Sequence, residues 1–229
     1  MTDVAGPSLR EQLQQIAEPF VAEVVAHPFW AGLCDGSLPP ESLAHFVLQD
    51  TAFLLPACGR AFAHCASIAA DDAFSALLAH CAFATVESAP RLRDALGGLA
   101  PGFGVELPSG RPDIAPETHA YCSFFRACAT ESFAAGIGGL LPMMWFHLEV
   151  CRTLRTSGRP GSRYAAWVDV YDPGEGAWQA VRAVLGMVDG FGERCAPAER
   201  ARLAEAFSLG ARHEWAFADG GLRRPGWPA

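Results

Sequence analysis

The stretch GGLLPMMWFHLEV, residues Gly138–Val150, decides the fold class, because it reads as one continuous apolar helix. It nevertheless contains a proline, two consecutive methionines, and a histidine followed two residues later by a glutamate. Pro142 has no N–H to donate to the carbonyl of Gly138, so we expect a kink there. Met143 and His147 are four residues apart and share one helix face beyond the proline. The residues alone leave two interpretations open: core packing, or the wall of a ligand cavity.

Helical spacing of apolar residues continues through almost every other segment, without an internal repeat or a long linker. The most loop-like stretch is 99–116. The sequence therefore predicts an all-α fold, a single helical domain over residues 1–229 with eight or nine helices and sites built from inward-facing side chains. The expected helices are 8–26, a short one after His27, 41–69, one that begins near Asp71 and is interrupted at Pro90, 117–132, 133–156, 162–170, 175–193 and 198–218.

Composition and charge exclude several classes of partner. Apolar residues make up 51% and charged residues 18%, which is too apolar for disorder, and the apolar runs are too evenly interrupted for a membrane span. The formal net charge is −8 and the 17 Lys and Arg residues are scattered, so no nucleic-acid partner is expected. Residues 1–15 lack a basic region followed by an apolar run. We therefore expect a cytoplasmic protein without a membrane partner.

Cysteine and histidine spacing gives little support for a redox or metal site. None of the eight cysteines stands in a C-x-x-C motif, and we expect them to be reduced and buried. The pairs His64–Cys65 and His80–Cys81 are helix neighbours that point apart, so neither is a ready nucleophile and base. The chain has no Glu-x-x-His pair of the kind that di-iron bundles use. No metal and no cofactor are expected.

A few polar residues interrupt the apolar helix patterns and are candidates for a site. Asp50 stands mid-helix among apolar residues, which is costly unless the carboxyl is paired, and Phe53 shares its face. Tyr121 and Tyr171 are two of only three tyrosines in a chain with 15 phenylalanines, which hints that their hydroxyls are used. Glu214 lies beside a histidine near the end of the last helix. For each residue a structural role and a site role remain open.

Five blocks in order make the chain resemble one known family. They are HPFWAGLCDGSLPPESLAHFVLQD (27–50), HAYCSFF (119–125), GLLPMMWFHLE (139–149), YAAWVDVY (164–171) and HEWAF (213–217). Together they resemble the TenA, or thiaminase II, family of the haem-oxygenase-like helical fold, over residues 9–218. The resemblance implies a multi-helix bundle with a central pocket for an aminopyrimidine, assembled as a homo-oligomer (dimer or tetramer). It also implies thiamin salvage, in which thiamin or its aminopyrimidine breakdown products are hydrolysed to hydroxymethylpyrimidine.

Four site residues of that family have matching residues here. Asp50 matches the aspartate that holds the aminopyrimidine ring, and Glu214 matches the glutamate that acts in acid–base catalysis. Tyr121 matches a pocket tyrosine, and Tyr171 matches the tyrosine that closes a Tyr-x-x-Trp-x-x-x-Tyr motif. The resemblance thus implies Asp50 and Glu214 as catalytic residues and the two tyrosines as ligand-binding residues.

Three positions depart from the family pattern, although the resemblance still places them in the pocket as ligand-binding residues. Met143 replaces the cysteine nucleophile, while Phe53 and His147 replace tyrosines. A thioether has no ionisable proton, so the covalent route through this position is closed. Family branches without the cysteine rely on carboxylates, and the loss of two phenols favours a changed substrate.

Three functions follow, and whether the chain is an enzyme stays open between them. The first is a hydrolase of an aminopyrimidine or related nitrogen heterocycle that lacks a cysteine nucleophile, with Glu214 or His147 activating water. The second is a non-catalytic protein of the same fold that binds such a heterocycle. The third is a metal- or cofactor-dependent oxidase of the same fold, which the His and carboxylate pattern supports least.

Overall fold

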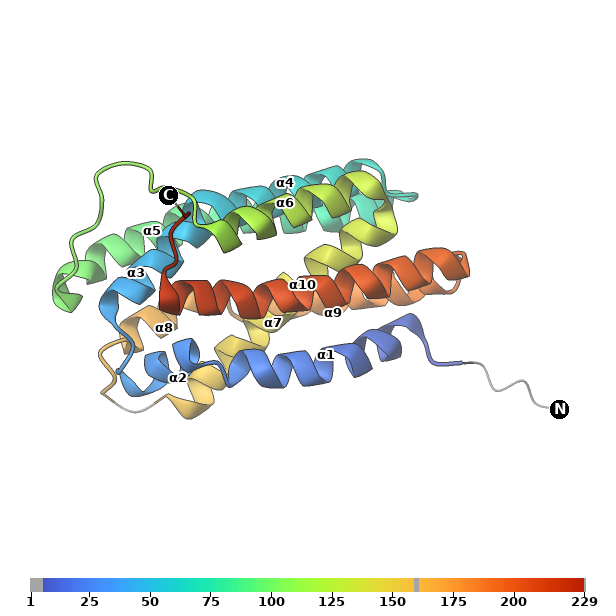
Figure 1. Ribbon diagram of the computed structural model, residues 1–229. Coiled ribbons are helices and arrows are strands. Elements are labelled where there is room, and N and C mark those ends of the chain that lie inside the picture. Colours follow the sequence, from blue (N-terminus) through green and yellow to red (C-terminus); the bar gives the residue numbers. More distant parts are fainter. Residues whose placement is uncertain (1–5, 159–160, 229) are drawn as a thin grey trace.

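The computed structural model describes residues 6–158 and 161–228, which contain α-helices, one π-helical turn and no strand (Figure 1). This confirms the all-α prediction. If α3, η1 and α4 are counted as one rod, the described residues form nine helices, within the predicted eight or nine. The elements are α1 (Leu9–Val25), α2 (Pro28–Asp35), α3 (Pro40–Gln49), η1 (Asp50–Leu54), α4 (Leu55–Ser67), α5 (Asp72–Phe103), α6 (Pro116–Glu131), α7 (Phe133–Ser157), α8 (Ala165–Tyr171), α9 (Glu175–Gly192) and α10 (Pro197–Arg223).

Helix starts follow the local sequence. Ser8 and Glu11 form a capping box at α1, in which the Ser8 hydroxyl accepts from the Glu11 N–H and the Glu11 carboxylate accepts from the Ser8 N–H. The side chains of Asp71 and Ser132 cap α5 and α7 in the same way, each accepting from the third residue onward. Proline occupies the first position of α2, α3, α6 and α10, where its missing N–H costs nothing.

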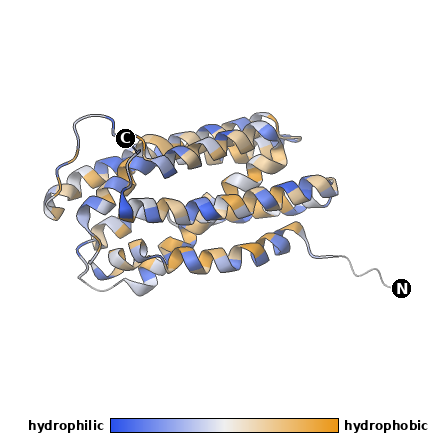
Figure 2. Cartoon of the chain, in the orientation of Figure 1, coloured by the Kyte–Doolittle hydropathy of each residue, from blue (hydrophilic) through white to orange (hydrophobic). Residues whose placement is uncertain are grey.

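The helix α7 lies at the centre of the bundle and packs closely against α10. Figure 2 colours α7 as largely hydrophobic, and it is long and apolar enough to cross a membrane. This corrects the expectation that no segment is apolar enough, but 67% of its most apolar window is buried inside the protein, as in a core helix. A Cβ on Gly138 would lie 2.3 Å from the Leu203 carbonyl oxygen, so glycine lets the two backbones approach. The helix runs through Pro142 without a break.

The helix α5 is longer than the sequence predicts. Pro90 was expected to interrupt it, but the helix continues past Pro90 and ends at Phe103, so the loop begins at Gly104 instead of residue 99. Pro90 removes the hydrogen bond to the carbonyl of Val86, and Val86 is exposed, so water can satisfy that carbonyl. Gly104 ends the helix with φ +74°, a left-handed conformation that favours glycine. The predicted connection at 156–161 includes Arg159 and Pro160, which lie outside the described residues.

The predicted rod 41–69 contains a π-helical turn, which the apolar pattern did not predict. Within η1 the N–H of Leu55 donates to the carbonyl of Asp50, five residues back. Thr51 adds a side-chain bond, because its hydroxyl donates to the Val47 carbonyl at 2.7 Å. A single π turn inserts one residue into a helix and changes the direction of the side chains around it. Asp50 is the first residue of this turn and is buried.

Candidate active site

Two carboxyl groups from distant parts of the chain lie inside the bundle within reach of each other's charge. Asp50 on η1 is 6% exposed, and its pKa is raised to about 8 by burial first and then by the charge of Glu214. Glu214 on α10 has its pKa raised to about 7 by burial. No described residue forms a hydrogen bond or an ion pair with the Asp50 side chain. A buried carboxyl group without a protein partner is costly, so this arrangement suits a ligand that supplies the partner.

Glu214 is anchored by a tyrosine from another helix. The hydroxyl of Tyr121 on α6 donates a hydrogen bond to Oε1 of Glu214, and this bond lowers the Glu214 pKa against the effect of burial. The ring of Tyr121 is fully buried between Phe125, at 4.3 Å between centroids, and His213, which stacks on it at 4.8 Å. Burial raises the pKa of Tyr121 well above its usual range, so the hydroxyl keeps its proton and remains a donor.

Two side chains of this group, Glu214 and His147, are only partly buried. Glu214 and His147 are both surrounded by protein, because burial is the largest cause of each pKa shift. Each nevertheless keeps part of its surface accessible. The pocket that the family resemblance implies at these side chains stays a prediction.

Tyr171, the last residue of α8, joins His147 to the carboxyl pair. Burial raises the pKa of Tyr171 well above its usual range, and the charges of Asp50 and Glu214 add to the effect, so the phenol lies within their electrostatic reach. The His147 ring stands edge-on to the Tyr171 ring, with centroids 4.5 Å apart. Trp30 of α2 lies nearly parallel to Tyr171 at 6.0 Å. Tyr171 thus contacts His147 and lies within the electrostatic range of Asp50.

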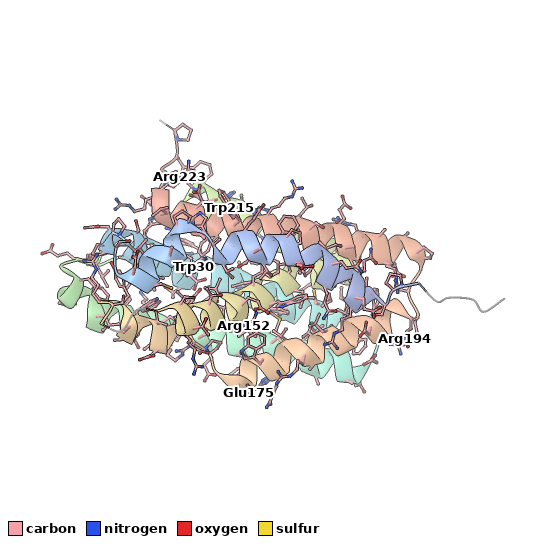
Figure 3. All side chains as sticks on the ribbon, turned by 90° about the horizontal axis from the view of Figure 1, so that it is seen from below. Trp30, Arg152, Glu175, Arg194, Trp215 and Arg223 are labelled. Carbon is pink, nitrogen blue, oxygen red and sulfur yellow. The ribbon has the colours of Figure 1, made fainter. Side chains whose placement is uncertain are left out.

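Trp30 is a member of this aromatic group that sequence reasoning missed. Its indole is 5% exposed, and its Nε1–H is buried without a hydrogen-bond partner in the described part of the chain. Figure 3 labels Trp30 on the α2 side of the bundle. Tryptophan in an apolar helix is ordinary core composition, so nothing in the spacing distinguishes it.

His147 is held as a neutral imidazole. Burial lowers its pKa to about 4, Arg91 lowers it further, and Asp172 and the Tyr171 carbonyl oppose the shift. Its Nε2 lies 3.6 Å from Sγ of Cys151, one turn further along α7. The i, i+4 spacing of His147 and Cys151 is visible in the sequence, whereas the dyads considered from the sequence were the adjacent pairs at 64–65 and 80–81.

The remaining two predicted residues, Met143 and Phe53, are half-buried against the core. The guanidinium of Arg111 lies 4.5 Å above the Phe53 ring, and its Nη2 donates to the Ala52 carbonyl at 3.4 Å. Phe53 therefore contacts the loop 104–115. The ligand-binding roles of Met143 and Phe53 stay predictions.

Two buried thiols also belong to this neighbourhood. The charge of Asp50 adds to burial in raising the pKa of Cys58 and of Cys122, which lie on α4 and α6. Both thiols therefore keep their protons. Sequence reasoning did not single them out, although Cys122 directly follows Tyr121.

Most cysteines behave as the sequence predicts. All eight are free and six are buried, whereas Cys34 and Cys195 are half-buried instead of buried as expected. The neighbours of the two suspected dyads point apart, because His64 and His80 are exposed while Cys65 and Cys81 are buried. Over residues 6–158 and 161–228, no group of three or more His, Cys, Asp or Glu side chains is placed to hold a metal ion.

Comparison with known proteins places this geometry in context. The model of the TENA/THI-4/PQQC family matches residues 11–223. The aminopyrimidine aminohydrolase of Bacillus subtilis is 27% identical over 204 residues, which cover 88% of this chain and 84% of that protein. The thiamine biosynthesis multifunctional protein ThiED of Corynebacterium efficiens is 28% identical over 228 residues, 97% of this chain but only 29% of that protein. A solved TenA homologue from P. horikoshii superposes with a TM-score of 0.77 at 23% identity, over 96% of this chain and 100% of that chain.

Proposed function

Because the chain belongs to the TENA/THI-4/PQQC family and has the all-α, haem-oxygenase-like fold of its TenA relatives, we propose that it hydrolyses an aminopyrimidine in thiamin salvage. The names of the two sequence relatives, an aminopyrimidine aminohydrolase and a thiamine biosynthesis protein, support this function. One observation carries it. Asp50 and Glu214 are two carboxyl groups inside the bundle, the first buried and the second half-buried, in reach of each other's charge, and their pKa values lie near neutrality.

Asp50 recognises the ring. With a pKa of about 8 its carboxyl group is mostly protonated at pH 7, so it offers one O–H donor and one carbonyl acceptor side by side. A 4-aminopyrimidine offers the complementary pair, a ring nitrogen that accepts and an exocyclic amine that donates. The two hydrogen bonds would satisfy the Asp50 side chain, which no described residue does.

Glu214 moves protons during hydrolysis. With a pKa of about 7 it is present in both protonation states at neutral pH, as a general acid and base requires. Water attacks the carbon that bears the leaving amine, its proton passes to Glu214, and the carbon–nitrogen bond breaks. The amine leaves with a proton, so water and the aminomethyl group become an alcohol and ammonia. Tyr121 holds the carboxylate in place.

The reaction runs without a covalent intermediate at residue 143. Met143 offers no thiolate, so water is the nucleophile. His147 is the other candidate for the base, but with a pKa of about 4 its imidazole binds protons too weakly for this role. Glu214 is therefore the proposed base.

Met143 also favours a second candidate, a binding protein that keeps the pocket without the reaction. Both functions need Asp50, and only hydrolysis needs Glu214 as a base. A ligand screen with product detection separates them. Aminomethylpyrimidine should raise the thermal midpoint of the wild type but not of Asp50→Ala.

Hydrolysis predicts hydroxymethylpyrimidine as product, and Glu214→Gln should lower its rate by about 10²–10⁴-fold. If the ligand binds but no product forms over hours, the second candidate function, a non-catalytic binding protein, would be supported instead. A Glu214→Gln variant as active as the wild type would contradict the proposed chemistry. Asp94→Asn, which changes an exposed carboxylate on α5, is the matched control.

The setting of the enzyme is part of the same proposal. We propose one domain, a cytoplasmic location and a homo-oligomer, in accordance with the TenA resemblance.

A metal- or cofactor-dependent oxidase is the least supported alternative, and iron in stoichiometric amounts in protein purified without chelators would favour it.

A further inference from the structure

A thiol on α7 lies between the ring of His147 and the backbone of Tyr171. Sγ of Cys151 is 3.6 Å from Nε2 of His147 and 3.9 Å from the carbonyl oxygen of Tyr171, to which it donates. Cys151 is buried, and it follows His147 by one helical turn on the same face. The proposed hydrolysis assigns no role to this pair.

The hydrogen bonds of this group determine which imidazole nitrogen carries the hydrogen. A thiol has one proton, and the Tyr171 carbonyl can only accept it, so in the arrangement in which the thiol bonds this oxygen the sulfur is an acceptor toward His147. In that arrangement Nε2 is the N–H donor. The Tyr171 carbonyl also favours the protonated imidazole. In a neutral imidazole with the hydrogen on Nε2, Nδ1 is an acceptor.

The imidazole stays neutral at physiological pH. The charged groups that face it are Arg91 of α5, which disfavours the imidazolium, and Asp172 after α8, which favours it. Burial outweighs both and sets the pKa at about 4. Tyr171 and Cys151, the titratable neighbours on α8 and α7, keep their protons because burial raises the pKa of each.

The acceptor nitrogen has no partner among the described residues. No described side chain or backbone group donates a hydrogen bond to Nδ1 of His147. The side chain keeps part of its surface accessible although it lies inside the protein, next to the phenol that reaches the carboxyl pair. The edge-on contact with Tyr171 fixes the plane of the ring.

We propose that Nδ1 of His147 accepts a hydrogen bond from an N–H of the bound heterocycle, and that Cys151 is the positioning residue that holds the imidazole in this tautomer. This rests on the proposed function, because it assigns a ligand contact in the same pocket. It narrows the ligand class to a heterocycle with an N–H donor on the edge that faces α7. A ligand with a carbonyl or ether oxygen at that edge would place one acceptor against another, Nδ1 of His147, and would bind more weakly.

The first test reads the tautomer in the free protein. Long-range nitrogen–proton NMR, with the His147 signals assigned through His147→Asn, should show the hydrogen on Nε2 in the wild type. Cys151→Ala should give a mixture of tautomers, and Cys151→Ser, which keeps a donor and an acceptor, should restore the wild-type form. Cys65→Ala removes another buried thiol and should leave the signals unchanged. A hydrogen on Nδ1 in the wild type would overturn the inference.

The second test reads ligand discrimination. Wild-type protein should bind aminomethylpyrimidine at least about tenfold more tightly than its methoxymethyl analogue. The analogue keeps the ring amine but lacks the N–H donor of the aminomethyl group. Cys151→Ala should weaken this preference and Cys151→Ser should keep it. His147→Asn places an amide oxygen near the position of Nδ1 and should retain part of the preference, whereas His147→Phe should abolish it.

The outcomes separate the two proposals. Equal affinity of the wild type for both pyrimidines would overturn this inference and leave the proposed function standing. Binding of neither pyrimidine would overturn the proposed function and the ligand contact together, and the tautomer measurement would still decide the role of Cys151.

Discussion

The Tyr121 hydroxyl donates a hydrogen bond to Oε1 of Glu214 and thereby ties α6 to α10 inside the bundle. The two residues are 93 positions apart in the chain, and each is held by burial as well as by this bond. The bond favours the ionised form of Glu214, so it sets the pH range in which the carboxyl group changes state.

Removal of this hydrogen bond should shift the pH dependence of the reaction. In Tyr121→Phe the ionised form of Glu214 loses its donor, so the Glu214 pKa rises above about 7. The limb of the kcat/KM profile that reports Glu214 should therefore move to higher pH. Tyr164→Phe is the matched control, because it removes a buried tyrosine hydroxyl bound to the Leu38 carbonyl instead. Identical limbs in wild type and Tyr121→Phe would argue against Glu214 as the titrating group.

Replacement of Asp50 should stabilise the protein above acid pH while it abolishes ligand binding. The folded-state pKa of about 8 lies above the unfolded value near 4, so the folded state holds a proton that the unfolded state has lost. Stability therefore falls as pH rises from about 4 to about 8. Asp50→Asn removes this pH-dependent cost, which is at most on the order of 5 kcal/mol at pH 8.

Thermal unfolding of both proteins across this pH range checks the expectation. The gain of Asp50→Asn over the wild type should grow from pH 4 to pH 8. A gain that is constant with pH, or that shrinks as pH rises, would show that Asp50 does not titrate as its burial implies. Asp94→Asn should show no such trend.

Return of a thiol to residue 143 should raise turnover. A cysteine there would stand on the α7 face that also carries His147. If the pocket is otherwise intact, Met143→Cys should turn over aminomethylpyrimidine faster than the wild type and form a mass adduct with a thiol reagent that the substrate blocks. Met144→Cys is the matched control, since adjacent helix residues point about 100° apart. Equal behaviour of the two variants would place residue 143 outside the pocket.

The loop 104–115 should loosen when one buried amide is removed. Gln49 donates to the Asp113 carbonyl at 2.8 Å and accepts from the Ala115 N–H at 2.9 Å, so one side chain holds two backbone groups. Gln49→Ala should cost about 1–3 kcal/mol of unfolding free energy. Hydrogen exchange should rise at residues 105–115, whereas Ser67→Ala, which removes an exposed hydroxyl bond, should leave it unchanged. Unchanged protection of Ala115 would count against this role.

The long amphipathic helices could be predicted from the sequence, because burial of an apolar stripe determines them. The central helix follows from the run at Gly138–Val150, and its predicted bounds of 133–156 differ from the observed ones by a single residue. The predicted interruption of α5 at Pro90 was wrong. The steric preference of proline does not reveal whether the carbonyl of Val86, which loses its hydrogen bond, faces water. The extent of α5 depended on that exposure.

The site could be predicted mainly through its resemblance to a family. Spacing alone left Asp50 open between a solvent stripe and a pocket, because the π turn that directs it inward has no signature in the apolar pattern. The contact between Cys151 and His147 was within reach of i, i+4 reasoning, whereas the approach of Cys58 to Asp50 depends on how η1 joins α4.

The π turn at Asp50–Leu54 separates two requirements that a regular helix would couple. The helix before it packs against α10, and the helix after it packs against α5 and α6. The extra residue between them rotates the side chains of α4 by about 100° relative to those of α3, so both helices can pack while Asp50 is buried. A one-residue deletion in this turn would remove that offset and force either Asp50 or the apolar face of α4 to turn.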